Sequence, residues 1–468
     1  MTGAKRWVRL ILVFYISACI SRASAGVAAD PFVAGKVIDT VICKADPTQS
    51  YALYIPARGN KEALPVIYFF DPHANGALPL KKYQSLAEAY GFILIGSNNS
   101  KNGNDWPATE NIWRHLSADV QARLKINGNR IYTCGFSGGA KVAGYVALQH
   151  HEIKGVIANG AGLPDGVPAG DLPFSFTAMA GEGDMNLTEL ISISNDLDKS
   201  RTRHYLIIFD GKYEWAPVNS MDIAWAGLQF DAMRMGLLPR DNGFISRYIL
   251  KSKQRLDLYA KTNQLIKAGR EYERSILFLD GLGSGSNDEV GWFRERATSL
   301  AGNALYRKQE QAEERLLLKE QNTKTEYMQH FQQGDMSYWV RIIDELKVRG
   351  SERNDEKGMY QRLLAYLSLA FYSISNHLIN GNANSEARHF TDLYKMADPG
   401  NSEAWYFSAI LHARDGQVSA VEGDLLKAVE NGFRDVTRLR QQPEFRELST
   451  RIHISAIERK MREPVKGN

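Results

Sequence analysis

Residues 130–140 read Arg130-Ile131-Tyr132-Thr133-Cys134-Gly135-Phe136-Ser137-Gly138-Gly139-Ala140. A short apolar run leads into Gly-x-Ser-x-Gly, and small residues follow it. In this order the pattern predicts a nucleophile elbow, a sharp turn between a strand and a helix that presents a serine hydroxyl. Ser137 is therefore the predicted nucleophile. A tight turn also needs Gly135 and Gly139 for steric reasons alone, so a purely structural interpretation of the motif stays open at this stage.

Apolar runs of strand length alternate with segments of helical periodicity on both sides of this motif. Helical spacing occurs at 80–90, 111–124 and 140–150. Such alternation predicts an α/β fold, in which a mostly parallel sheet carries helices on both faces. In such a sheet the functional groups collect at the carboxyl ends of the strands. The predicted strands are 41–43 and 51–55, expected as an opening hairpin, then 66–70, 92–96, 131–134, 156–159, 174–180 and 205–209.

From about residue 241 the chain changes to long charged helical segments without strand signals. A single tetratricopeptide-like repeat is visible near the end of the chain. One repeat cannot bury its own apolar face, so we expect the preceding helices to be diverged repeats stacked against it, with a non-repetitive helical bundle as the alternative. The chain is thus predicted to form one domain at 36–240 and a partly tetratricopeptide-like α-helical domain at 241–468. The tetratricopeptide spacing is matched by Pro399, Ala404-Trp405, Ala409, Gly416, Leu425 and Ala428, although Val421 stands where an alanine is usual.

Five stretches of the first domain carry a family resemblance. They are 49–56 (QSYALYIP), 69–73 (FFDPH), 95–103 (IGSNNSKNG), 135–139 (GFSGG) and 209–215 (FDGKYEW). Together they resemble exported bacterial α/β-hydrolase esterases of the dienelactone-hydrolase and polyhydroxybutyrate-depolymerase type, in particular those with a C-terminal tetratricopeptide-type helical domain. The resemblance spans nearly all of residues 40–220, and it implies an α/β-hydrolase fold for the first domain.

The resemblance also implies a catalytic triad in the order serine, acid, histidine. Ser137 maps onto the nucleophile, and Asp184, which follows the strand 174–180, maps onto the acid. The last stretch usually reads Gly-x-His-Glu-Trp, so Tyr213 stands in the histidine position. A tyrosine with an ordinary pKa of about 10 is almost wholly protonated at pH 7 and cannot accept the serine proton. Tyr213 therefore predicts weak hydrolysis or none.

An oxyanion hole is implied at the N–H groups of Gly138 and His73, because the intervening Pro72 has no N–H to donate. The strand 66–70 is expected beside the nucleophile strand, which makes the His73 side chain a candidate substitute base; a surface or positioning role is the alternative. No metal-ligand spacing and no glycine-rich phosphate loop is present, so no metal and no cofactor are predicted.

The N-terminus reads as an export signal. Basic residues precede the apolar run 10–20, and small residues follow, which predicts a signal peptide at 1–25. Two processing routes stay open: cleavage after Ala25, or a lipoprotein signal at 16–19 whose Cys19 is acylated. The expected location is therefore the periplasm, the extracellular space, or a lipid anchor at the cell envelope.

Charge argues against polyanionic partners. The formal net charge is +4, and the first 25 residues contain four basic and no acidic residues, so the remainder is neutral. A neutral chain has no electrostatic basis for nucleic-acid binding, and membrane association is expected only through Cys19. Of the other two cysteines, Cys43 and Cys134 fall on strands predicted to lie apart, which favours free buried thiols over a disulfide.

Two functions of different classes stay open. The first is a serine hydrolase of carboxylic esters, such as decorated polysaccharide or polyester, that works slowly or with an unusual base. The second is a catalytically inactive hydrolase-fold protein that binds a small molecule, glycan or polyester-type ligand in the old pocket, while the helical domain docks a protein partner.

Overall fold

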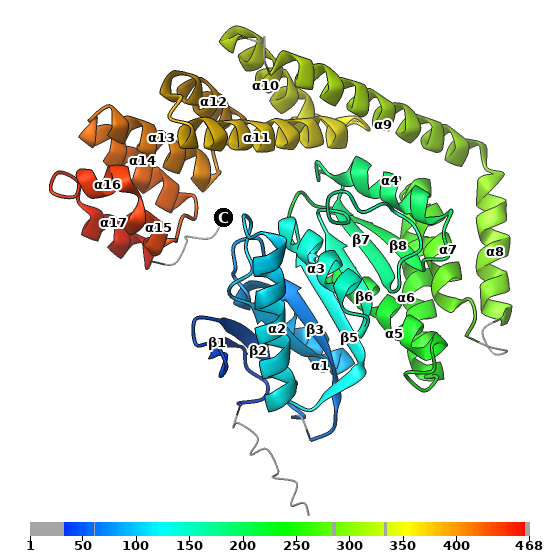
Figure 1. Ribbon diagram of the computed structural model, residues 1–468. Coiled ribbons are helices and arrows are strands. Elements are labelled where there is room, and N and C mark those ends of the chain that lie inside the picture. Colours follow the sequence, from blue (N-terminus) through cyan, green and yellow to red (C-terminus); the bar gives the residue numbers. More distant parts are fainter. Residues whose placement is uncertain (1–31, 60, 283–286, 332–334, 464–468) are drawn as a thin grey trace, which may run out of the picture.

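The computed structural model describes residues 32–463 apart from residue 60, 283–286 and 332–334 (Figure 1). The predicted signal sequence, including Cys19 and the cleavage site after Ala25, lies outside the described residues. No helix in the described ranges is both long enough and apolar enough to span a membrane.

The first domain is built on one eight-stranded sheet with the order β1-β2-β4-β3-β5-β6-β7-β8. β1 pairs antiparallel with β2, and β2 with β4, while all other neighbours are parallel. The predicted α/β-hydrolase fold class is thereby confirmed, including the opening hairpin. The strands are β1 (Ile38–Ile42), β2 (Ser50–Tyr54), β3 (Leu64–Phe70), β4 (Ile93–Ser97), β5 (Ile126–Phe136), β6 (Ile153–Asn159), β7 (Ser175–Gly181) and β8 (His204–Phe209).

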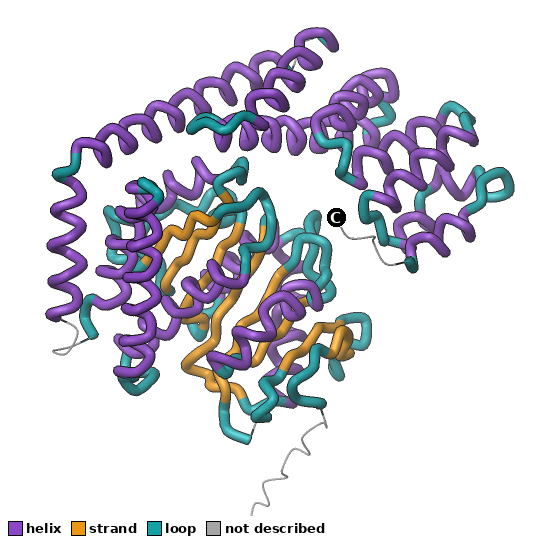
Figure 2. The backbone as a smooth tube through the Cα atoms, turned by 180° about the vertical axis from the view of Figure 1, so that it is seen from behind, coloured by secondary structure: helices purple, strands orange, loops and turns teal. Residues whose placement is uncertain are grey.

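Helices cover both faces of this sheet, as Figure 2 shows. α2 (Trp106–Arg123), α3 (Gly138–Gln149) and α4 (Leu187–Leu197) contribute to one buried apolar cluster. α1 (Ala77–Tyr90) and α5 (Val218–Arg234) contribute to the cluster on the other face.

β3 explains why the strands read as continuous apolar runs. Every residue of β3 is buried. Side chains alternate between the two faces of a strand, so Tyr68 and Phe70 enter the first cluster while Ile67 and Phe69 enter the second. A strand buried on both faces has no polar side, and this is the pattern from which the strands were predicted.

Three further helices share a core with the edge of the sheet. α6 (Asn242–Lys261), α7 (Leu265–Leu279) and α8 (Asn287–Ala301) pack in one cluster with β8 and α5. In this cluster the ring of Phe230 in α5 lies 5.0 Å from Tyr248 and 5.4 Å from Phe278 between centroids. The predicted boundary between residues 240 and 241 therefore crosses a shared apolar core and not a linker.

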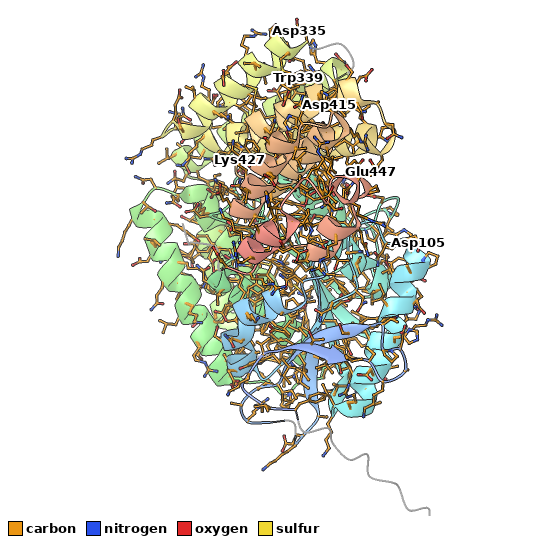
Figure 3. All side chains as sticks on the ribbon, turned by 90° about the vertical axis from the view of Figure 1, so that its left-hand side faces the viewer. Asp105, Asp335, Trp339, Asp415, Lys427 and Glu447 are labelled. Carbon is orange, nitrogen blue, oxygen red and sulfur yellow. The ribbon has the colours of Figure 1, made fainter. Side chains whose placement is uncertain are left out.

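The rest of the chain is helical. α9 (Ala304–His330) leads from α8 across the sheet domain to a second body with its own core, which runs from Tyr327 to Met461 (Figures 1 and 2). Figure 3 shows this body with Asp335, which caps α10, and the fully buried Trp339 labelled. Its elements are α10 (Met336–Ser351), α11 (Lys357–Asn380), α12 (Asn384–Ala397), α13 (Ser402–Arg414), α14 (Val418–Glu430), α15 (Val436–Gln441), α16 (Pro443–Glu447) and α17 (Ile454–Met461).

The residues that suggested a tetratricopeptide repeat lie in the hairpin of α13 and α14. Ala404, Ala409, Leu425 and Ala428 are fully buried there, and so is Val421. Gly416, with φ of +70°, occupies the turn between the two helices. The assignment of this hairpin to the tetratricopeptide class stays a prediction.

Candidate active site

Ser137 occupies a strained turn between β5 and α3. Its backbone has φ of 57° and ψ of −128°, a conformation that costs a non-glycine residue on the order of 1–3 kcal/mol. The flanking glycines make the turn sterically feasible. A Cβ on Gly135 would lie 1.9 Å from the Gly139 oxygen, and one on Gly139 would lie 2.0 Å from the Phe70 oxygen. The turn therefore has the backbone geometry expected of a nucleophile elbow.

The three predicted triad positions lie at the carboxyl ends of their strands. Ser137 follows β5, Asp184 follows β7, and Tyr213 follows β8. Ser137 is half-buried and its N–H donates to the Asn159 oxygen at the end of β6, at 2.9 Å. The parallel sheet thus brings together residues that are far apart in the sequence.

Tyr213 contacts Ser137 directly. Its phenol hydroxyl donates a hydrogen bond to the Ser137 Oγ. The Tyr213 ring lies 4.8 Å from that of Phe136, and Gly160 permits this contact, because a Cβ there would lie 2.8 Å from the Phe136 ring and 3.1 Å from the Tyr213 ring. In the part of the chain that the structure describes, no histidine forms a hydrogen bond with Ser137.

The backbone after Tyr213 is fixed by its neighbours. Asn159 donates from Nδ2 to the Glu214 oxygen at 3.2 Å and accepts from the Ala216 N–H at 2.7 Å. The Trp215 indole N–H donates to Asp71 Oδ2 at 3.0 Å. This segment can shift little, and the ring of Tyr213 is therefore held against the serine.

Asp184 is fully buried and only half satisfied. Its Oδ1 accepts the Asn186 N–H at 2.8 Å, whereas its Oδ2 is buried without a hydrogen-bond partner among the described residues. Burial raises the pKa of Asp184 to about 7, against the lowering effects of the Asn186 N–H and of the Lys324 and Arg362 charges. The carboxyl therefore titrates near neutral pH, well above the ordinary range of an aspartate.

Tyr213 is a proton donor in this setting. Burial raises its pKa to about 12; the hydrogen bond with Ser137 opposes this shift, and the negative charges of Asp184 and Glu189 add to it. The phenol is therefore neutral at pH 7, and its proton points at the atom that a general base would have to deprotonate.

The two predicted oxyanion donors have different surroundings. Gly138 begins α3, and the side chain of Asn102 lies against it, since a Cβ on Gly138 would meet Asn102 Oδ1 at 2.0 Å. The His73 side chain is exposed, and its N–H donates to Asp71 Oδ1 at 3.0 Å. That N–H is engaged within its own turn, so the roles suggested for His73 receive no support from this geometry and stay predictions.

Sequence reasoning missed several residues that shape the site. Asn159 ends a strand that was predicted, but its hold on the segment after Tyr213 has no local signature. Asp71 and Asn102 lie within stretches that carried the resemblance, so a signal was present although no role was assigned to them. Among the described residues, no group of His, Cys, Asp or Glu is arranged to hold a metal ion. Cys43 and Cys134 are free and buried.

Comparison with known proteins gives similar solved structures but no family. No protein-family model matches the chain, and no curated protein matches it. A ferulic acid esterase is 14% identical, with 41% of this chain and 95% of that chain covered and a TM-score of 0.33. Esterase B from Lactobacillus rhamnosis is 16% identical, with 44% and 89% covered and a TM-score of 0.35. S-formylglutathione hydrolase from Agrobacterium tumefaciens is 16% identical, with 39% and 89% covered and a TM-score of 0.30.

Identities this low concern the fold alone, and TM-scores below 0.5 add no argument to it. The assignment to the α/β-hydrolase fold rests instead on the strand order and on the turn at Ser137.

Proposed function

We propose that this chain is an α/β-hydrolase-fold protein that binds carboxylic-ester or related carbonyl ligands at Ser137 without turning them over at an ordinary enzymatic rate. The observation that carries the proposal is the hydrogen bond from the Tyr213 hydroxyl to the Ser137 Oγ. Tyr213 donates a hydrogen bond to the serine hydroxyl at the place where hydrolysis needs a group that accepts the serine proton.

The chemistry of the pair supports slow turnover. A serine hydroxyl attacks a carbonyl only as a neighbouring base removes its proton. Tyr213, with its pKa raised to about 12 mainly by burial, holds its own proton throughout the physiological range. Loss of the histidine from a serine triad costs on the order of a millionfold in kcat, and what remains comes from the oxyanion hole and from binding.

Weak ester hydrolysis is the second candidate, and the strained turn at Ser137 favours it. A non-glycine residue at φ of 57° costs stability, and the close approaches at Gly135 and Gly139 constrain the sequence around it. Such a turn continues to present the serine hydroxyl and the Gly138 N–H to a ligand. Residual catalysis over water of roughly a thousandfold or more is consistent with an oxyanion hole alone.

The wider context is part of the proposal. We propose an exported protein, placed in the periplasm, outside the cell or on a lipid anchor, whose ligand is a small-molecule, glycan or polyester-type ester. The helical region is proposed to dock a protein partner, because stacked helical hairpins offer an extended surface for binding.

An ester-analogue screen of the purified protein tests the function, with Ser137→Ala as the matched control. We expect a kcat far below the ordinary range of roughly 1 to 1,000 per second. Intact mass after incubation with a serine-directed phosphonate should show slow labelling that Ser137→Ala abolishes. A wild-type kcat within the ordinary range that disappears in Ser137→Ala would overturn the proposal in favour of an efficient hydrolase.

A further inference from the structure

The helical region reaches the candidate active site at the turn that carries Asp184. α9 and α11 pass over the end of β7 and the start of α4 (Figure 1). The turn between these elements, residues 182–186, presents its backbone oxygens to them. Arg362 in α11 donates to the Glu182 oxygen at 2.7 Å, and Lys324 in α9 donates to the Met185 oxygen at 2.9 Å.

A buried carboxylate joins the two cations. Glu320 is fully buried; its Oε2 pairs with Arg362 at 2.7 Å and accepts a hydrogen bond from the Arg362 Nε, whereas its Oε1 lies 2.7 Å from the Lys324 Nζ in an ion pair without hydrogen-bond geometry. Arg362 is itself 7% exposed. Buried charges are costly unless each is paired in good geometry, and removal of one partner of such a group is strongly destabilising. The pair of Glu320 and Arg362 therefore tolerates few alternative arrangements, and the half-buried Lys324 places a second cation beside the same carboxylate.

On its inner side the turn is tied to the sheet domain, where the Glu182 and Gly183 N–H groups donate to the Phe209 and Gly211 oxygens at 2.8 Å and 2.9 Å. The Asn186 side chain donates to the Gly160 oxygen at 2.7 Å, and the Glu182 carboxylate pairs with Lys267 at 2.7 Å near the surface. Exposed ion pairs of this kind contribute little. On the outer side, the buried Arg362 of α11 and the half-buried Lys324 of α9 donate the hydrogen bonds that the backbone oxygens of this turn accept from the helical region.

We propose that Lys324 and Arg362 are positioning residues of the Ser137 site, which hold the turn 182–186 and thereby place the Asp184 carboxyl. The inference rests on the proposed function in treating Asp184 as part of that site. In this proposal the helical region forms part of the Ser137 site and is not a separate unit without influence on it.

Four charged or titratable groups interact electrostatically with Asp184. They are Glu189 from α4, Lys324 from α9, Arg362 from α11 and Tyr213 from the loop after β8. The two cations lower the pKa of Asp184, and Glu189 raises it. Removal of either cation is therefore expected to leave Asp184 protonated up to a higher pH.

Infrared difference spectroscopy tests this in the full-length protein. The carbonyl stretch of protonated Asp184 is followed against pH, and each spectrum is referred to the same protein carrying Asp184→Asn. We expect a midpoint near pH 7 in the wild type, because burial raises the pKa of Asp184 to about 7. Lys324→Gln and Arg362→Gln should each raise the midpoint by about one pH unit, the order expected when a nearby unit charge is removed. Lys324→Arg keeps the charge and should restore the wild-type midpoint.

Lys319→Gln is the matched control. Lys319 also lies in α9 and contacts Glu356 and Tyr360 across the two helices, but it does not bond to the turn. Hydrogen exchange of peptides covering 182–188 supplies the positional readout. It should quicken in Lys324→Gln and Arg362→Gln and stay unchanged in Lys319→Gln.

The outcomes separate the roles. Unmoved midpoints in both cation variants, or an equal shift in Lys319→Gln, would overturn the proposal. Faster hydrogen exchange without a shift of the Asp184 midpoint would leave the cations a purely structural role and would overturn the proposal. A shift of the midpoint without faster exchange would also overturn it. If Arg362→Gln fails to fold, Lys324→Gln decides alone, since Arg362 then still pairs with Glu320. None of these measurements needs Ser137 to react, so failure of the proposed function is seen separately in the ester screen.

Discussion

At the scale of single residues, Asp184 and Tyr213 are mismatched. In a serine triad the acid accepts the Nδ1–H of the histidine. Here the Asp184 Oδ2 is buried without a donor, and the tyrosine ring has no N–H to offer. Under the proposed function, Asp184 supplies the acceptor that a triad needs, and position 213 lacks the matching donor. Because Asn159 holds the backbone after Tyr213, a residue substituted at position 213 would keep the same backbone position.

Tyr213→His is expected to create or raise esterase activity. The imidazole would donate to the Asp184 Oδ2 and accept the Ser137 proton, so we expect kcat on an activated ester to rise by at least a hundredfold. Tyr213→Phe is the control, because it removes the hydroxyl from Ser137 without supplying a base and should not raise kcat to this extent. Addition of Asp184→Asn to Tyr213→His should abolish most of the gain. An equal rise in Tyr213→Phe would show that release of the serine, and not a base, was limiting.

Asp184 also makes stability depend on pH. Its folded-state pKa, raised by burial to about 7, exceeds the unfolded value of about 3.9, so the folded state binds the proton more tightly. The free energy of unfolding therefore falls as pH rises from about 4 to about 7, by up to about 4 kcal/mol from this group. Asp184→Asn should flatten that part of the curve, as measured by urea unfolding at pH 5 and pH 8. An unchanged difference between the two pH values would contradict the assigned shift.

At the scale of elements, the turn between β5 and α3 depends on backbone contact. A Cβ at Gly135 would overlap backbone atoms of Gly139, which cannot move without opening the turn. Gly128 lies in the same strand with nothing within 4 Å of its Cβ position. Gly135→Ala should therefore lower the free energy of unfolding by roughly 1–3 kcal/mol or more, whereas Gly128→Ala should change it by less than about 1 kcal/mol. Urea unfolding monitored by tryptophan fluorescence measures both, and equal effects would mean that the turn relaxes.

The sequence made the elements of the sheet predictable because strands buried on both faces read as apolar runs, as in β3. The turn at Ser137 was predictable because its backbone approaches are too close for any side chain at Gly135 or Gly139. The ties of Lys324 and Arg362 to the turn 182–186 were not. They join charged side chains to backbone oxygens, and because every residue has a backbone oxygen, the sequence does not show which one accepts. The orphaned Oδ2 of Asp184 likewise depends on burial that only the assembled fold creates.

At the scale of the whole molecule, the sheet domain and the first helices after it form one unit. Tyr205 of β8 and Phe230 of α5 are almost fully buried, and Phe278 of α7 lies 4.6 Å and 5.4 Å from their ring centroids. This apolar contact was not foreseen, because the helical periodicity of residues 242–279 shows an apolar face without showing what covers it. A chain that ends near Leu238 would expose the aromatic edge of the sheet to water.

We therefore expect a chain that ends at Leu238 to be insoluble or unfolded, and a chain that ends at Ala301 to fold, because only the second retains α6–α8. Each large aromatic side chain removed from a core costs about 3–5 kcal/mol, and loss of Tyr248 and Phe278 together approaches the whole stability of an ordinary domain.

A matched pair of substitutions in the full chain tests the same contact without truncation. Phe278→Ala, at a fully buried position, should lower the stability by about 3–5 kcal/mol, and Leu277→Ala, at a position 42% exposed, by less than about 1 kcal/mol. Cooperative thermal unfolding of the Leu238 chain, with Phe278→Ala as stable as the wild type, would instead establish that the sheet domain is complete without these helices.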